Sequence, residues 1–217
     1  MQVALCGRRP DKVREAAESL PNNAIGMVAD LSTPEGATAW IEQAMAELGQ
    51  IDILIANCGG PPPGTFASTK LDAFRPALDM NLTSTVAMCY AAIPLMQERK
   101  WGRVVAITSI SVRQPIPQLI LSNTSRAGVT GFLKTVALEV APDGVTVNTI
   151  QPGNHLTDRT RAMGHANLEA ATKAIPVGVI GDAEDFGKVA AFLCSEPAKF
   201  ITGASLNVDG GAYRALQ

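Results

Sequence analysis

Short apolar runs alternate with longer segments of helical periodicity along the sequence, and this alternation limits the folds that the chain can adopt. The apolar runs have the length and composition of β-strands, and they cover residues 3–6, 24–28, 51–56, 103–108, 145–150 and 205–208. The helical segments begin near Pro10, Thr33, Lys70, Gln118 and Asp182, and we expect residues 152–176 to be irregular. Such alternation predicts βαβ units and a parallel sheet covered by helices on both faces.

Composition narrows the class of protein further. The 217 residues, of which 47% are hydrophobic and 18% charged, can bury one sizeable core, so we expect a single domain over residues 1–217. A formal net charge of -2 at pH 7 gives no overall positive charge for nucleic acid. The longest apolar run, 86–96, is too short to span a bilayer. We therefore expect binding to neither nucleic acid nor membrane.

The spacing of the cysteines indicates reduced thiols and therefore a reducing compartment. Cys6, Cys58, Cys89 and Cys194 lie far apart and show no CxxC or Cys/His ligand spacing. This spacing predicts neither a disulfide framework nor a metal site. Because the first residues also lack the apolar core of a signal peptide, we expect a cytoplasmic protein.

Four separated motifs belong together by their order and spacing. Asn57-Cys58-Gly59, Ser109 and Pro152-Gly153 each follow an apolar run, and Asn81-Leu82 lies in a helical segment. Each motif alone is weak, since a lone Asn-x-Gly or Pro-Gly is usually only a turn. Together with 201–203 and 208–211, they resemble the short-chain dehydrogenase/reductase family, in particular its 3-oxoacyl-acyl-carrier-protein reductase group.

The resemblance implies a fold, an activity and a set of site residues. The fold is a Rossmann-type doubly wound parallel sheet, and the activity is hydride transfer between NAD(P) and a carbonyl or secondary alcohol. The catalytic positions of the family fall on Asn81, Ser109, Ser122 and Arg126. The positions that would contact the cofactor are Arg8, Arg9, Asp30, Leu31, Asn57, Gly59, Pro152, Gly153 and Thr157.

Two of the catalytic positions depart from the family pattern. The family has a tyrosine thirteen residues after its serine and a lysine four residues later, where this chain has Ser122 and Arg126. A tyrosine acidified by the lysine supplies the proton for carbonyl reduction, and serine is a much weaker acid. Arginine stays charged and cannot relay protons. We expect Ser109, Ser122 and a water to polarise the carbonyl, with His155 as a further candidate acid.

The family's first strand, glycine-rich turn and following helix have no counterpart in this sequence. About 30 residues, one strand-plus-helix unit, are absent by family spacing. We expect that Met1 is an internal methionine of a longer reading frame. In the doubly wound order the absent strand leaves a gap of roughly 10 Å, two strand spacings, in the sheet. Either the first two strands slide over to pair with the next strand, or a partner fills the gap.

The end of the first apolar run bears on the cofactor. Members of the family that prefer NAD carry an acidic residue here, whereas this chain has Gly7 followed by Arg8 and Arg9. A guanidinium binds a phosphate with two parallel hydrogen bonds. We therefore expect NADP to be preferred, with NAD possible, and Asp30-Leu31 to lie at the adenine.

Two other functions stay open, and the resemblance also implies an assembly. The absent phosphate loop and tyrosine favour a catalytically silent member that binds a ligand or subunit. A dehalogenase-like enzyme on the same scaffold, which binds no dinucleotide, is the second alternative. The family usually forms homotetramers, so we expect contacts through 70–99 and 204–216, with a small carbonyl or alcohol as the substrate.

Overall fold

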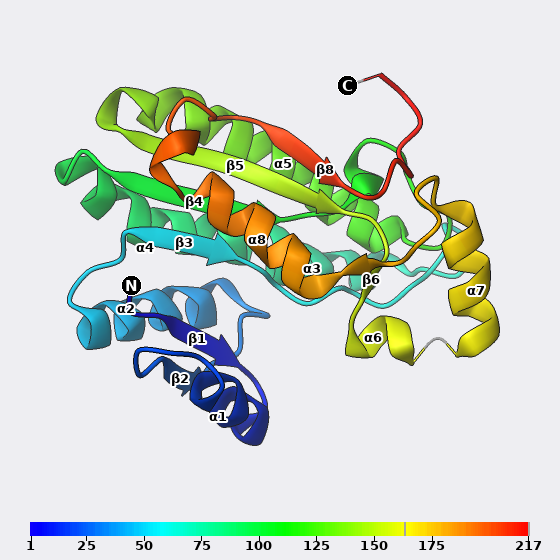
Figure 1. The fold of residues 1–217 in the computed structure, drawn as a ribbon, viewed down its shortest axis with the longest axis horizontal. Coiled ribbons are helices and arrows are strands. Elements are labelled where there is room, and N and C mark those ends of the chain that lie inside the picture. Colours follow the sequence, from blue (N-terminus) through cyan, green and yellow to red (C-terminus); the bar gives the residue numbers. More distant parts are fainter. Residues whose placement is uncertain (163, 217) are drawn as a thin grey trace.

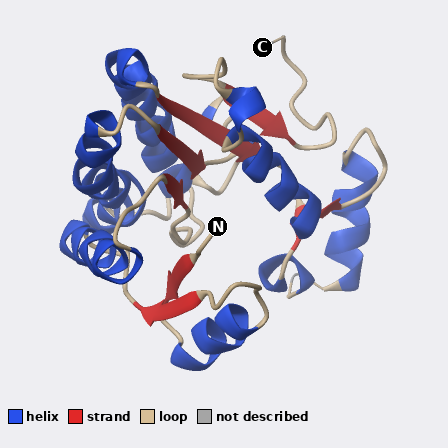
Figure 2. Cartoon of the chain, turned by 60° about the vertical axis from the view of Figure 1, so that its left-hand side comes forward, coloured by secondary structure: helices blue, strands red, loops and turns tan. Residues whose placement is uncertain are grey.

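The computed structural model describes residues 1–162 and 164–216, so that Met163 and Gln217 lie outside the described residues. Its main sheet is parallel and has the strand order β3-β4-β5-β8 (Figure 1). These strands are β3 (Ile53–Ala56), β4 (Gly102–Ile107), β5 (Val145–Pro152) and β8 (Ser205–Val208). A second parallel pair is formed by β1 (Ala4–Gly7) and β2 (Ile25–Val28), and Figure 2 shows it standing apart from the main sheet.

Helices connect the strands. Their bounds are α1 (Pro10–Glu18), α2 (Pro34–Leu48), α3 (Phe74–Leu78), α4 (Ser84–Glu98), α5 (Ile120–Val140), α6 (Asp158–Arg161), α7 (His165–Ala174) and α8 (Ala183–Leu193). The start of α2 follows from its sequence: the Thr33 side chain accepts a hydrogen bond from Gly36 N at 3.1 Å, and Pro34 occupies the first turn. None of the helices in the described part of the chain is long and apolar enough to cross a membrane.

The core lies on both faces of the main sheet. On one face, α2, α4 and α5 pack against it with residues such as Ile41, Met96 and Leu133. On the other face, Val105 and Ile150 form a smaller cluster with Leu193 of α8. Because β4 and β5 are covered on both faces, almost all their residues are buried, as the continuous apolar runs predict.

Most predicted elements are confirmed, but one is wrong. The six predicted strands and the helix starts agree with the structure to within a few residues. Residues 152–176, expected to be irregular, instead contain β6 (His155–Leu156), α6 and α7. Helix α6 begins with a capping box between Thr157 and Thr160, and α7 buries no residue, so neither has the apolar periodicity that reveals a helix in a sequence. The strand β6 pairs with β7 (Gly181–Asp182).

The gap expected in the sheet is present. The first two strands have not slid across, because β1 pairs with β2 and β3 pairs with β4, and the two sheets stay separate in the described chain. Helix α2 spans the distance between them and contacts both β1 and α4. The single domain over 1–217 stays a prediction.

Candidate functional site

The candidate residues follow the carboxyl ends of the parallel strands. In open α/β sheets this edge is where ligands bind. Of the predicted residues, Arg8 and Arg9 follow β1, Asp30 and Leu31 follow β2, Asn57 and Gly59 follow β3, Ser109 follows β4, and Pro152 and Gly153 lie at the end of β5. The fold therefore brings groups from distant parts of the sequence to one edge.

Asn81 fixes the turn after β3. It lies in a π-helical turn, Asp79–Thr83, and only 2% of its surface is exposed. Its Nδ2 donates to the carbonyl oxygen of Gly59 at 2.6 Å, and its Oδ1 accepts from the Oγ of Ser125 at 3.1 Å. A single π turn inside a helix is frequent at functional sites because it re-aims one side chain. Here the turn points Asn81 at the Gly59 backbone.

Arg126 ties together the ends of two neighbouring strands. Its Nη1 donates to the carbonyl oxygen of Ile107 at 2.8 Å, and its Nη2 lies 3.3 Å from the carbonyl of Gly59 and 3.4 Å from that of Cys58. The Gly59 carbonyl thus accepts from both Arg126 and Asn81. Burial raises the pKa of the Cys58 thiol, and the Arg126 charge offsets part of that increase. The guanidinium therefore braces the backbone beneath the predicted active site.

Ser109 and Ser122 are half-buried hydroxyls near this network. The Oγ of Ser109 accepts from the backbone N–H of Ser111 at 3.1 Å and caps the short turn Ile110–Val112. Ser122 lies in the first turn of α5, four residues before Arg126, so both side chains lie on one face of the helix.

Ser125 is a member of the network that the sequence did not reveal. It is completely buried and connects α5 to Asn81. A buried serine inside a helix does not change the pattern of apolar residues from which helices are predicted. Only its contact with Asn81 identifies it.

The residues after β1 and β2 are more open. Arg8 and Arg9 are exposed at the turn before α1. Asp30 is exposed as well, and its Oδ1 accepts from Ser32 N at 3.0 Å. Leu31, by contrast, packs against the main core. Of the predicted Asp30-Leu31 pair, the aspartate is therefore the residue that faces the edge.

The loop after β5 is held tightly at its beginning. Gly153 N donates to the carbonyl of Val208 at 3.0 Å, and a Cβ at this glycine would lie only 2.8 Å from the Cα of Asp209. Thr157 is exposed and caps α6. The His155 ring packs edge-on against Phe186 with ring centroids 4.8 Å apart, which makes it a packing residue first.

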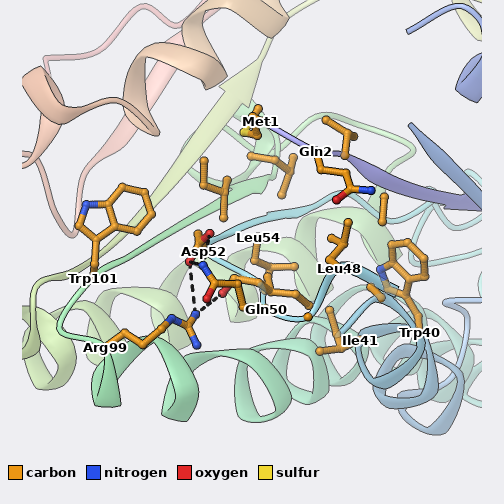
Figure 3. Close-up of a pocket in the computed structure, with 17 residues that line it drawn as sticks. Met1, Gln2, Trp40, Ile41, Leu48, Gln50, Asp52, Leu54, Arg99 and Trp101 are labelled. Atoms are coloured by element: carbon orange, nitrogen blue, oxygen red, sulfur yellow. Dashed lines mark hydrogen bonds and ion pairs between the residues drawn. The ribbon is translucent and has the colours of Figure 1, made fainter. Parts of the chain in front are cut away.

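The structure also contains a cavity away from the candidate site, and it bears on the question of a metal site. A cavity of about 1010 Å³ lies between β1 and β3 (Figure 3), but it is lined from the amino ends of the strands, away from the candidate site. Among residues 1–162 and 164–216, no group of three His, Cys, Asp or Glu side chains is arranged to hold a metal ion.

Comparison with known proteins assigns the family. A family model described as enoyl-(acyl carrier protein) reductase matches residues 1–213. The 3-oxoacyl-acyl-carrier-protein reductase of Vibrio cholerae is 33% identical over 194 residues, which are 89% of this chain and 80% of the relative. The corresponding reductase of Pseudomonas aeruginosa is 34% identical over 200 residues, which are 91% of this chain and 81% of the relative.

A solved structure agrees with the sequence relatives. The L-sorbose reductase from Gluconobacter frateurii, complexed with NADPH and L-sorbose, is 27% identical and superposes with a TM-score of 0.91 over 99% of this chain and 88% of its own. This likeness confirms the Rossmann-type α/β fold class that the sequence predicted. The chain therefore belongs to the short-chain dehydrogenase/reductase family.

Proposed function

We propose that the chain is an NADP-preferring oxidoreductase that transfers hydride between a nicotinamide cofactor and a carbonyl or secondary alcohol. The observation that carries this proposal is the hydrogen-bonded network at the ends of β3 and β4, in which Asn81 and Arg126 share the Gly59 carbonyl. The relatives that match over most of the chain are reductases of 3-oxoacyl groups, which supports a carbonyl rather than an alkene as the reacting group.

The residues after β1, β2 and β3 fit the adenosine end of a dinucleotide. At the adenosine end, exposed Arg8 and Arg9 can bind a 2′-phosphate, and Asp30 faces the same edge. Asn57 and Gly59 present an exposed turn at the end of β3. At the other end of the site, Gly153 packs closely against Asp209, which fixes the backbone at the start of the loop after β5. We assign the start of this loop, with Thr157, to the nicotinamide.

The chemistry divides between the cofactor and the chain. When bound, the nicotinamide supplies or accepts the hydride. The hydroxyls of Ser109 and Ser122 donate hydrogen bonds to the substrate oxygen, and the Arg126 charge favours negative charge developing on it. Neither hydroxyl is a strong acid, so water delivers the proton. A missing general acid costs roughly 10² to 10⁴ in rate, and we expect turnover slower than that of tyrosine-containing relatives by such a factor.

The two alternatives are less well supported. If the chain were a silent binding protein or a dehalogenase-like enzyme, we would expect it to resemble proteins without reductase activity. The two sequence relatives and the solved structure are all named as reductases. Turnover with NADPH on a panel of carbonyl compounds separates the three functions. Cofactor binding without any turnover would favour the silent member.

We also propose a cytoplasmic homotetramer whose substrate is a small molecule. Exposed apolar side chains support the assembly, because Tyr90 on α4 and Leu138 on α5 are 75% and 69% exposed. The edge strand β8 carries a third such residue, Leu206. A monomer in light scattering at micromolar concentration would contradict the tetramer.

The cofactor preference is tested by titrating the protein with NADPH and NADH while following nicotinamide fluorescence. We expect NADPH to bind more tightly, and Arg8→Ala or Arg9→Ala to weaken NADPH binding roughly ten- to a hundredfold with little effect on NADH. The matched control is Arg14→Ala, which removes an exposed arginine from the body of α1. Equal affinities for the two cofactors, or no effect of either arginine, would contradict the proposal.

A further inference from the structure

Three consecutive prolines, residues 61–63, follow the turn after β3 that we assign to the cofactor, residues 57–59. Pro61 is buried, Pro62 and Pro63 are exposed, and residues 57–63 belong to no helix or strand. Proline fixes its own φ and keeps the residue before it out of the helical region. This proline segment is therefore stiff and extended, with a length of about 3.1 Å per residue.

The far end of the proline segment is attached to the start of α5. Gly64 N donates to the carbonyl of Gln118 at 2.7 Å, and the carbonyl of Gly64 accepts from Ile120 N at 3.3 Å. The first N–H groups of a helix have no partner inside the helix, and the N-cap side chain of α5, Leu119, makes no capping hydrogen bond. Gly64 therefore supplies the acceptor that the first residue of α5 needs.

The backbone of Gln118 shows how firmly this attachment is made. Its φ is 65°, in the left-handed region that residues other than glycine rarely adopt. Such a conformation costs free energy and persists only where surrounding contacts hold it. The hydrogen bond that the Gln118 carbonyl accepts from Gly64 is one of these contacts.

The near end of the proline segment is attached to the same helix. The carbonyl of Gly59 lies 3.3 Å from Nη2 of Arg126, and it also accepts from Asn81 at 2.6 Å. Residues 59–64 and residues 120–126 of α5 thus form a closed ring with a hydrogen bond at each end. Ser122 lies in the helical side of this ring, between the two points of attachment.

The lengths of the two sides of the ring agree. The five extended steps from Gly59 to Gly64 span about 15 Å. The six helical steps from Ile120 to Arg126 rise about 9 Å, and the long Arg126 side chain covers the remaining distance to Gly59. Because neither the proline segment nor the helix can shorten, the ring fixes the first turn of α5 relative to the turn at residues 57–59.

We propose that the proline segment is a positioning element for Ser122. It sets the distance between the cofactor turn and the first turn of α5, and thereby the place at which the Ser122 hydroxyl meets the substrate oxygen. A shift of about 1 Å in a reacting group can cost about a hundredfold in rate, so this distance matters. The role of Ser122 rests on the proposed function, whereas the ring exists without turnover.

The rate test uses Pro62→Ala combined with Pro63→Ala, which changes two exposed residues and keeps both hydrogen bonds of Gly64. The control is Pro197→Ala, which removes an exposed proline from the turn Glu196–Ala198. We expect the double variant to slow single-turnover carbonyl reduction by about three- to tenfold, with less than about a twofold change in NADPH affinity. The control should change neither quantity.

A double-mutant cycle separates positioning of Ser122 from general damage to the chain. If the proline segment acts through Ser122, the same two alanines should slow a Ser122→Ala chain by less than about twofold. Equal losses of rate in both backgrounds, or no loss in the unchanged background, would overturn the proposal.

Amide hydrogen exchange tests the ring without turnover. We expect the Ile120 amide, which donates to Gly64, to exchange at least about threefold faster in the double proline variant, while the Leu133 amide in the body of α5 is unchanged. If no variant reduces a carbonyl, the proposed function fails, and exchange decides on the ring alone; it also decides if Ser122→Ala leaves no measurable rate. Unchanged exchange at Ile120, or equal acceleration at Leu133, would contradict the proposal.

Discussion

The β4–β5 pair and the β1–β2 pair are built from similar apolar runs, yet their surroundings differ. Nearly every residue of β4 and β5 is buried, and each of these strands has a partner on both sides. All four residues of β1 are only half-buried, and β2 alternates between half-buried and exposed. Each strand of this smaller pair has one partner, and α1 packs against the pair.

This comparison teaches that burial is set by neighbours rather than by the strand's own sequence. A two-stranded sheet is marginally stable by itself, whereas a sheet with helices on both faces forms a cooperative core. The smaller pair keeps its place through α2, which contacts β1. We therefore expect the β1–β2 unit to open locally before the main sheet unfolds.

The largest expected effect is a change in the free energy of unfolding, and it should differ between the main core and the β1–β2 pair. Leu133, 1% exposed in the main core, and Val13, 6% exposed against Gly7 and Gly26 of the smaller pair, are both buried aliphatic residues. Leu133→Ala should lower the free energy of unfolding by about 2–5 kcal/mol. Val13→Ala should lower the free energy of global unfolding by less than about 1 kcal/mol. The lost packing should instead favour local opening of the β1–β2 unit.

Urea denaturation followed by circular dichroism measures the global effect of these two changes. Amide hydrogen exchange measures the local effect, and we expect Val13→Ala to accelerate exchange in β1, α1 and β2 but not in the main sheet. If both variants lowered global stability equally, the two units would unfold together and the comparison would fail.

A smaller loss of stability is expected on replacing Arg126, and a still smaller one on replacing Arg8. Arg126 donates to backbone carbonyls at the ends of β3 and β4, whereas Arg8 is exposed after β1. Arg126→Ala leaves these carbonyls without a charged donor and should cost about 1.5–3 kcal/mol. Arg8→Ala should change stability by no more than about 0.5 kcal/mol. Thermal unfolding of both variants measures this, and equal losses would show that Arg126 does not brace the strand ends.

The smallest expected effect concerns the reaction, whose proposed groups lie on the larger half. The double variant Ser122→Tyr with Arg126→Lys restores the family's acid and should raise single-turnover carbonyl reduction by about tenfold, a part of the usual contribution of a general acid. Restoration stays partial because a phenol must fit beside a helix packed around serine. Each single change should help little, since the tyrosine depends on the lysine for its lowered pKa.

The matched control for this experiment is Ser122→Ala. If the unchanged chain were the fastest of the set and Ser122→Ala abolished its activity, the serine would be a working catalytic group. NADPH affinity, which we assign in part to Arg8 and Arg9 on the smaller half, should change less than the rate in every variant.

Much of the fold was predictable because local rules act within short windows. The apolar runs located all the strands of the main sheet and of the β1–β2 pair, and Thr33-Pro34 located the start of α2. The prediction failed over 152–176, which contains the short helix α6 and the helix α7. Helix α6 follows a capping box and α7 buries no residue, so a search for a buried apolar stripe finds neither helix.

The candidate site also has a part that the sequence predicted and a part that it did not. The motif positions Asn81, Ser109, Ser122 and Arg126 were read from spacing, and the structure gives Asn81 and Arg126 a common acceptor in Gly59. The role of Ser125 and the bracing by Arg126 were not predictable, because each depends on an atom more than 40 residues distant or on a strand end.

By itself the sequence determined the alternation of strands and helices, the family motifs and the unusual serine and arginine, because each is recorded in residue type and spacing. Only the tertiary structure decided that β1 and β2 do not slide over to pair with β3, an arrangement that the sequence left open. The physical reason is that strand pairing and burial are properties of neighbours. The helix α2 packs against the main core and fixes where the smaller pair lies, and no local pattern in β1 or β3 encodes that distance.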